Sequence, residues 1–355
     1  MSKTHSSLLP NGLIDLLSPG AESEARVIAS FMKEFSAFGY ARVKPPLVEF
    51  EESLLGEGPG QTLVRQTFRM MDPVSQRMMG VRADVTAQIA RIATSRLADE
   101  QRPLRLSYAA DVLRVNGTQL RPERQFCQVG CEMIGADSLM ADVETPLVAL
   151  KALSSIGIGK LSVDLTVPTL VAHIYDETRT DEEMRETLNG LIEKRDRDAI
   201  AAQGGEAAKL IVELMLRKEG FDKIALPKNA RADMNRILAV AGELQSALNI
   251  YGLNDVQITI DPLERRGFEY QTGVSFTLFA IGARGEIGRG GRYDVAARGK
   301  AAETATGFTL YMDTILRVAP PLEEPRRQSV SADASWEDVK ALQDQGIQIS
   351  RRHDY

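Results

Sequence analysis

The stretch QFCQVGCEMIG, residues 125–135, places an amide and a carboxylate at a spacing that could hold a ligand. Read as an extended strand with alternating sides, it sends Gln128, Gly130 and Glu132 to one face. The other face is apolar and consists of Cys127, Val129, Cys131 and Met133, so we expect buried thiols. An ionised glutamate facing a sheet needs a cationic partner. A protein arginine or a ligand ammonium would serve, and this strand alone does not separate the two.

Two further stretches place polar groups where an apolar core does not require them. VRADVT puts Arg82, Asp84 and Thr86 on one side of a strand that runs into a helix. The structural alternative is that Asp84 or Thr86 only caps that helix, which contributes about 1 kcal/mol. VLRVN interrupts an apolar strand with Arg114. The alternative for Arg114 is a buried partner for some carboxylate.

A fourth polar stretch, RRGFEYQTGVSF, brings Arg266, Glu269 and Tyr270 beside Gly267. An arginine and a tyrosine hydroxyl at a strand start marked by glycine suit the recognition of a polar ligand. One such stretch is weak evidence, but four in one mixed sheet predict a pocket for a zwitterion. Carboxylates would contact its ammonium group, and an arginine would contact its carboxylate or a phosphate.

The composition narrows the class of protein. The chain has 355 residues, 43% of them hydrophobic, and a net charge of −6 with a pI near 5.4, which argues against a large nucleic-acid footprint. No apolar run approaches the roughly 20 residues of a membrane span, and the N-terminus has no signal-peptide pattern, so we expect a cytoplasmic protein without membrane contact. Three scattered histidines give no metal-binding pattern.

Apolar spacing predicts an α+β fold. Helices are expected at 18–40, 85–100, 141–157 and 307–319, and a hairpin is expected at 67–84. Strands are expected at 102–117, 124–135, 160–168, 256–262, 268–282 and 285–294. Because the strands outnumber crossover helices and come in hairpin-like runs, we expect a mostly antiparallel sheet flanked by helices. The glycine-rich stretch IGARGEIGRGG does not follow the dinucleotide-binding pattern.

The chain is expected to form one core and a short tail. Residues 1–320 would make the core, with a charged, alanine-rich helical insertion at 176–255. Residues 321–355 would be a linker and a short C-terminal remnant, because PPLEEPRRQSVSADAS has linker composition and the rest is short for a domain.

Taken in order, these segments resemble the class II aminoacyl-tRNA synthetases in their histidyl form. GYARVKPPLVEF resembles motif 1, and LRVNGTQLRPERQFCQVGCEMIG resembles motif 2. VRADVT, RRGFEYQTG and GGRYD resemble the segments that form the histidine pocket, and the similarity runs from about residue 8 to residue 318. The resemblance implies a histidine or effector site made of Asp84, Thr86, Arg114, Gln128, Glu132, Arg266, Glu269 and Tyr270.

The sequence departs from the synthetase pattern where adenylation chemistry would occur. Asn116 stands where motif 2 has a glutamate, and Asp313 and Thr314 stand where motif 3 has an acidic residue and an ATP-gripping arginine. Threonine does not supply the permanent cation that offsets charge on a transferring phosphoryl group. Gln271 replaces the second tyrosine of the pocket, and the residues after 320 are too few for an anticodon-binding domain of roughly 100 residues.

These departures are similar to those of the regulatory subunits of ATP phosphoribosyltransferase, a family related to the synthetases. The resemblance implies no catalysis of its own, no cofactor and no tRNA. It also implies a complex with the short-form catalytic subunit, which condenses ATP with phosphoribosyl pyrophosphate in the first step of histidine biosynthesis and responds to histidine. A homodimer around Pro45 and Pro46 within a hetero-octamer is expected, although the proline pair alone also fits a rigid loop. The alternative is an active histidine-adenylating enzyme or a truncated histidyl-tRNA synthetase.

Overall fold

The computed structural model describes residues 8–56, 58–118, 121–265, 267–268, 270–296, 301–321 and 326–352. Two of the expected site residues, Arg266 and Glu269, lie outside the described residues. The chain divides into two compact units, one that ends at Ala319 and one that begins at Pro320.

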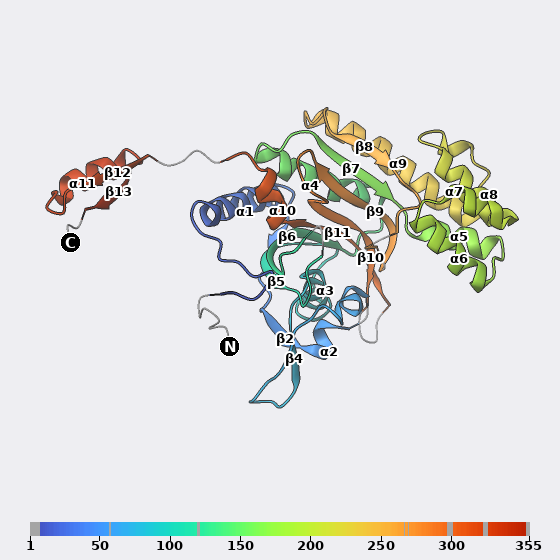
Figure 1. Cartoon of the computed structure of the whole chain (residues 1–355), viewed down its shortest axis with the longest axis horizontal. Helices are drawn as coiled ribbons and strands as arrows, with labels where there is room; N and C mark the ends of the chain where they lie inside the picture. Colours follow the sequence, from blue (N-terminus) through green and yellow to red (C-terminus); the bar gives the residue numbers. More distant parts are fainter. Residues whose placement is uncertain are drawn as a thin grey trace, which may run out of the picture. The chain divides into compact units, whose positions relative to one another are not determined.

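The first unit is built on an eight-stranded sheet (Figure 1). In spatial order its strands are β1 (Ala41–Arg42), β5 (Leu104–Leu113), β6 (Gln125–Ile134), β11 (Glu303–Tyr311), β10 (Gly288–Val295), β9 (Gln271–Ala280), β7 (Leu161–Thr166) and β8 (Gln257–Ile260). Only the two outer pairs, β1 with β5 and β7 with β8, are parallel. The five inner pairs are antiparallel, which confirms the expected sheet type.

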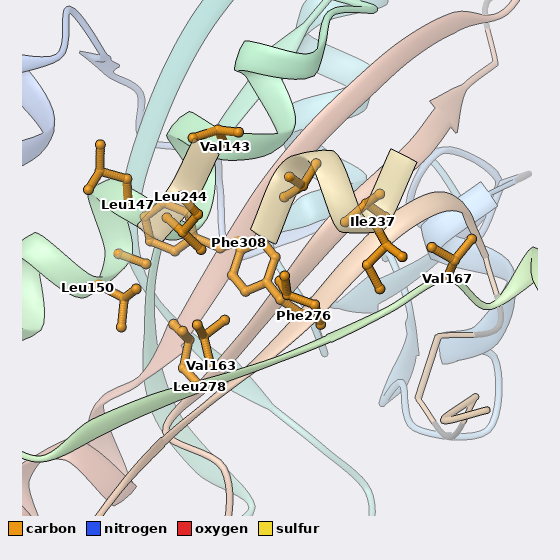
Figure 2. Close-up of a cluster of buried hydrophobic side chains, with 14 of the residues drawn as sticks. Val143, Leu147, Leu150, Val163, Val167, Ile237, Leu244, Phe276, Leu278 and Phe308 are labelled. Atoms are coloured by element: carbon orange, nitrogen blue, oxygen red, sulfur yellow. The ribbon is translucent and has the colours of Figure 1, made fainter. Parts of the chain in front are cut away.

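One face of this sheet carries the main hydrophobic core. The helices α1 (Gly20–Ala37), α4 (Leu139–Ser155) and α9 (Lys228–Ile250) contribute apolar side chains to it. Figure 2 shows Leu147 and Leu150 of α4 and Leu244 of α9 gathered near Phe276 and Phe308 of the strands. The helix α4 is apolar nearly all round, as a helix enclosed between a sheet and other helices must be.

A smaller core on the opposite face holds the helix α3 (Thr86–Ser95) against β5. Beside it lies a three-stranded sheet in the order β2 (Val48–Phe50), β4 (Met78–Val81), β3 (Arg69–Met71). The pairing of β3 with β4 confirms the hairpin expected at 67–84. The short helices α2 (Glu51–Leu54) and η1 (Gly58–Leu63) complete this region, seen below the main sheet in Figure 1.

A helical region connects the parallel strands β7 and β8, and its outer helices form the end of the first unit farthest from α1 in Figure 1. Besides α9, it contains α5 (Thr169–Glu177), α6 (Glu182–Glu193), α7 (Arg197–Gln203), α8 (Gly205–Leu216) and η2 (Phe221–Lys223). Helices thus run from Thr169 to Ile250, over the part of the chain where the sequence suggested a helical insertion at 176–255.

The prediction of a helix at 307–319 is wrong for residues 307–311, which form a strand. Strand β11 continues to Tyr311, and α10 runs only from Met312 to Val318. The strand forms because β6 and β10 flank it and satisfy its backbone on both sides. Phe308 and Leu310 enter the main core while Thr309 between them contacts Tyr108 of the smaller core, which is the period of a strand.

The second unit is a small β-α-β arrangement. Strand β12 (Arg327–Val330) pairs in parallel with β13 (Gln348–Arg351), and α11 (Trp336–Asp344) connects them. The linker expected over 320–335 is thus partly a strand, and Ser335 caps α11 by accepting from the backbone N–H of Asp338 at 3.1 Å. Among the described residues, no helix is both long enough and apolar enough to cross a membrane.

Candidate functional site

Glu132 lies at the centre of the candidate site, on the face of β6 away from the main core. Its side chain is 1% exposed. The hydroxyl of Thr86 donates to Oε1 at 3.1 Å, and the hydroxyl of Tyr293 donates to Oε2 at 2.9 Å. Burial raises the pKa of Glu132 to about 8 despite these two hydrogen bonds, and the charge of Asp84 raises it further. The carboxyl group is therefore largely protonated at neutral pH.

A glycine on the neighbouring strand makes room for this carboxyl group. The register pairs Glu132 with Gly307 of β11. A Cβ atom at position 307 would come within 1.8 Å of Glu132 Oε2 and within 2.5 Å of the Cys131 carbonyl oxygen. Any larger residue at position 307 would thus displace the carboxyl group or the strand.

Gln128 and Asp84 form a second polar pair beside Glu132. Gln128 Nε2 donates to Asp84 Oδ2 at 2.7 Å, and Gln128 Oε1 accepts from the backbone N–H of Val85 at 3.0 Å. Asp84 Oδ1 accepts from the backbone N–H of Thr86 at 2.9 Å, where α3 begins. Asp84 therefore holds the first backbone N–H of α3, although the N-cap residue is Val85, and it also fixes the Gln128 amide.

Arg114 lies at the edge of this group. Its Nη2 is 3.9 Å from Asp84 Oδ2, and its Nε donates to the Ala83 carbonyl oxygen at 3.2 Å. Arg82 serves a different purpose, because it donates to the carbonyl oxygens of Pro45 at 3.0 Å and Asp111 at 2.6 Å. Arg82 thus fixes the chain before β2 and is not part of the cavity lining.

Two aromatic residues and one amide close the site on the side of β9 and β10. The rings of Tyr270 and Tyr293 meet edge to face with centroids 5.7 Å apart. Burial raises the pKa of both hydroxyl groups well above the usual value, so both remain protonated donors. Gln271 pairs with Tyr293 across the strands and is 8% exposed.

These residues surround a small cavity that adjoins a wide cleft. The cavity, of about 40 Å³, is lined by Glu132, Thr86, Tyr293 and Gln271 among others. The cleft measures about 1140 Å³. Both hollows are lined by Asp84, Tyr270, Arg289 and Tyr311. A ligand could therefore place a small side chain in the cavity and its polar remainder in the cleft.

Two arginines of the cleft, Arg121 and Arg289, are paired with acidic groups of the protein. Arg121 Nε lies 3.1 Å from Asp313 Oδ2, and its guanidinium group lies 3.7 Å from the centroid of the Tyr311 ring. Arg289 donates to Glu286 and, at 2.9 Å, to the Gly267 carbonyl oxygen. Thr314 lines the cleft without contributing charge. Arg121 and Arg289 are thus cations that already have acidic partners.

The structure brings most of the expected site residues together. Asp84, Thr86, Gln128 and Glu132 form one hydrogen-bonded group, with Tyr270 across the cavity and Arg114 at the edge. The list drawn from the sequence missed Tyr293, Gly307 and Arg289. Tyr293 belongs to GGRYD, a stretch already singled out, whereas Gly307 was assigned to a helix. Arg289 lies between two glycines in IGARGEIGRGG, a stretch that gave no binding signal.

Comparisons with known proteins show which family the chain resembles. Residues 12–315 match the protein family described as histidyl-tRNA synthetase. A relative from Rhodospirillum centenum, named ATP phosphoribosyltransferase regulatory subunit, is 49% identical over 96% of this chain and 88% of its own length. A protein of the same name from Paramagnetospirillum magneticum is 46% identical over 96% of this chain and 89% of its own length.

Solved structures show the same fold. One from Bacillus halodurans, titled as an ATP phosphoribosyltransferase regulatory subunit/histidyl-tRNA synthetase, superposes with a TM-score of 0.80 at 22% identity, over 99% of this chain and 94% of the other. Histidyl-tRNA synthetase from a Nostoc species gives a TM-score of 0.77 at 18% identity, over 99% and 87%. On these grounds the chain belongs to the ATP phosphoribosyltransferase regulatory subunit family and has the class II fold of histidyl-tRNA synthetase.

Proposed function

We propose that this chain assembles with a short-form ATP phosphoribosyltransferase catalytic subunit, enables the first step of histidine biosynthesis, and carries the histidine site through which that step is inhibited. The names of the close relatives support the partner and the pathway. The observation that carries the effector site is Glu132, a buried carboxyl group held by Thr86 and Tyr293 at the wall of a small cavity. No catalysis, cofactor or tRNA is required of the chain itself.

The shape of the site supports a particular orientation of histidine. Asp84 lines both the cleft and the cavity, whereas Glu132 lines the cavity alone. The imidazole ring would enter the cavity beside Glu132, and the ammonium group would lie near Asp84 at its mouth. The carboxylate would then lie in the cleft within reach of Arg114, because guanidinium groups pair well with carboxylates.

The alternative, histidine adenylation, has less support. Adenylation needs cations free to bind the phosphates of ATP. Arg121 is instead paired with Asp313, in the segment where the synthetases carry the motif 3 arginine. Histidine-dependent exchange between ATP and pyrophosphate in the purified chain would favour the alternative.

We also propose that the chain forms a homodimer through the region of Pro45 and Pro46, within a hetero-octamer. Arg82 donates to both proline carbonyl oxygens, at 3.0 Å and 3.2 Å, and Gln88 donates to that of Pro46 at 2.8 Å. The adjacent Leu47 is 51% exposed. A rigid backbone that presents an apolar side chain suits an interface, and light scattering of the chain with and without the catalytic subunit tests the assembly.

Calorimetric titration of histidine into the full chain, alone and in complex with its short-form catalytic subunit, tests the function. We expect histidine to bind and to inhibit turnover of the complex, with a coupling free energy of about 1–3 kcal/mol. The chain alone should show no phosphoribosyltransferase turnover. Histidine that neither binds nor inhibits would remove the effector site from the proposal. Turnover by the chain alone would contradict the regulatory role.

A further inference from the structure

Strand β3 has a backbone edge that is open on one side. In the part of the chain that the structure describes, β3 pairs with β4 alone, and all three of its residues are exposed. The backbone N–H of Asp72 donates to the Arg77 carbonyl oxygen at 2.9 Å, towards β4. Because backbone groups alternate in direction along an antiparallel strand, those of Arg69 and Met71 point away from β4. Such an edge can pair with a further extended strand.

Both faces of the hairpin formed by β3 and β4 carry exposed methionine. Met71 pairs with Met78 across the strands on one face, and Met70 pairs with Met79 on the other. Met71 is 64% exposed, and Met70 and Met78 are each 42% exposed. The hairpin extends below the main sheet in Figure 1. Flexible methionine side chains that gather at an exposed edge are typical of a surface that binds another protein.

A hollow lies beside the hairpin on the face that carries Met71. Its volume is about 500 Å³, and Arg69, Met78, Leu55 and Val64 are among the residues that line it. Arg69 precedes Met71 by two residues, and Met78 is the cross-strand partner of Met71, so all three side chains project to one face. The apolar groups of Leu55, Val64 and Met78 suit an apolar side chain that enters the hollow from another chain.

The open edge and the hollow are self-complementary about a twofold axis. When two copies of β3 pair in antiparallel fashion with Met70 at the centre, the outward backbone groups of Arg69 in each copy meet those of Met71 in the other. Directly opposite residues share a face, so each Met71 side chain then lies beside Arg69 of the opposite copy, at its hollow. Arg69 is 3.1 Å from Glu51 Oε1, so the pairing brings no unmatched arginines together.

We propose that β3 forms an interface between two copies of this chain, through antiparallel pairing of the two strands and reciprocal insertion of Met71 into the hollow. The inference rests on the proposed hetero-octamer and adds a contact to it. An octamer with four copies of each subunit contains four copies of this chain, and one twofold interface at Pro45 and Pro46 joins only two of them. The β3 interface joins one such pair to the other.

Sedimentation velocity of the complex with the catalytic subunit tests this interface. Met71→Glu places a charge in the hollow, so it should weaken the association of the two halves at least about 10-fold and lower the mass towards that of half an octamer. Val74→Glu is the matched control, because Val74 is 91% exposed in the turn beyond the pairing residues, and the mass should not change. Both variants should keep the circular dichroism of the unchanged chain, since both positions are exposed.

A cysteine at the centre of the pairing reports the contact directly. Met70 would face Met70 of the other copy with a Cα separation of about 4.5 Å, which a disulfide bond can span. Met70→Cys should therefore give a disulfide-linked dimer on mild oxidation of the full chain in its complex. Ser75→Cys, at an exposed position in the turn, should not. Cys127 and Cys131 are 5% and 0% exposed, so they do not compete in the reaction.

The outcomes distinguish this inference from the proposed function. If the unchanged complex contains four copies of this chain, but Met70→Cys is not linked and Met71→Glu keeps the full mass, the inference is overturned and the hetero-octamer stands. If the unchanged complex contains only two copies, the hetero-octamer and the inference both fail. Histidine binding should be the same in Met71→Glu as in the unchanged chain, because none of the residues 69–78 lines the small cavity.

Discussion

At the scale of single residues, the site depends on an acid that the fold keeps buried and uncharged. The carboxyl group of Glu132 accepts hydrogen bonds from Thr86 and Tyr293, and both favour the carboxylate form. Burial outweighs them and raises the pKa of Glu132 to about 8. A ligand that brings a cation or an N–H donor into the cavity would shift that balance towards the carboxylate. Burial of Glu132 thus lowers the stability of the ligand-free protein. A ligand that brings a cation or an N–H donor to its carboxyl group would offset that loss.

The raised pKa predicts how stability depends on pH. The folded chain holds the Glu132 proton more tightly than the unfolded chain, so this group makes stability fall as pH rises from about 4.5 to about 8. Glu132→Gln removes the titration. We expect the variant to gain roughly 4 kcal/mol relative to the unchanged protein between about pH 5 and pH 8.5, measured by urea unfolding. Glu206→Gln, an exposed change on α8, is the control, and a pH-independent difference for Glu132→Gln would contradict the assignment.

The same substitution tests the effector site in the assembled complex. Glu132→Gln keeps the shape of the side chain but never becomes a carboxylate, so it lacks the charge that would bind a cationic ring. We expect the complex to form and turn over while histidine inhibits it at least about 10-fold less tightly, measured as the inhibition constant. Loss of the complex itself would show that Glu132 has a structural role instead.

The close packing around Gly307 predicts what a side chain at this position would do. Gly307→Ala places a methyl group against both the Glu132 carboxyl group and the backbone of β6, so the strand or the carboxyl group must move. We expect a loss of about 1–3 kcal/mol in the free energy of unfolding, together with weaker histidine binding. Gly190→Ala in α6 is the matched control, because nothing lies within 4 Å of its new methyl group and alanine favours a helix. Equal stability of the two variants would contradict the crowding at position 307.

At the scale of elements, one buried carboxylate joins three of them. Asp142 on α4 accepts from Arg292 of β10 at 2.9 Å and 2.6 Å, and from Arg236 of α9 at 2.8 Å. Its side chain is 1% exposed. Arg292 precedes Tyr293 in β10. The ion pairs of Asp142 therefore hold α4 and α9 against the sheet, and they also fix the strand whose Tyr293 donates a hydrogen bond to Glu132.

Breaking this interaction should destabilise the whole first unit. Asp142→Asn leaves the buried guanidinium group of Arg292 without its charge partner, and such changes typically cost about 3–5 kcal/mol. Chemical denaturation measures the effect. Asp137→Asn is the control, because Asp137 lies 3.4 Å from the same arginine but its side chain is 77% exposed. It should cost less than about 1 kcal/mol. Similar losses in the two variants would show that burial of the pair contributes little.

At the scale of the whole molecule, the two units have separate hydrogen-bonded frameworks. The eight-stranded sheet, both hydrophobic cores and every described residue of the candidate site belong to the unit that ends at Ala319. The second unit closes its own two-stranded sheet with α11. A unit with its own core can fold by itself. We propose on this basis that the site does not depend on the residues after 319.

Truncation after Ala319 tests this independence. The shortened chain should keep its far-ultraviolet circular dichroism, unfold at nearly the same temperature and bind histidine with the affinity of the full chain. Both forms are compared at equal concentration, so that any effect of assembly on the midpoint is matched. A shortened chain that aggregates, or binds histidine much more weakly, would show that the first unit needs the second.

Elements whose residues follow a regular period were predictable from the amino-acid sequence. The alternation of β6 separated Cys131 from Glu132 correctly, and the hairpin at 67–84 followed from its turn residues. The family resemblance implied Asp84, Thr86, Gln128 and Glu132, and the structure joins these four residues by hydrogen bonds. The remaining features depend on which distant strands become neighbours, and local sequence spacing carries no information about that. Residues 307–311 form a strand only between β6 and β10, which supply the hydrogen bonds that a helix would otherwise make internally. The pairing of Gln271 with Tyr293, and the ion pair between Arg121 and Asp313, likewise join segments too far apart in the chain for local spacing to indicate.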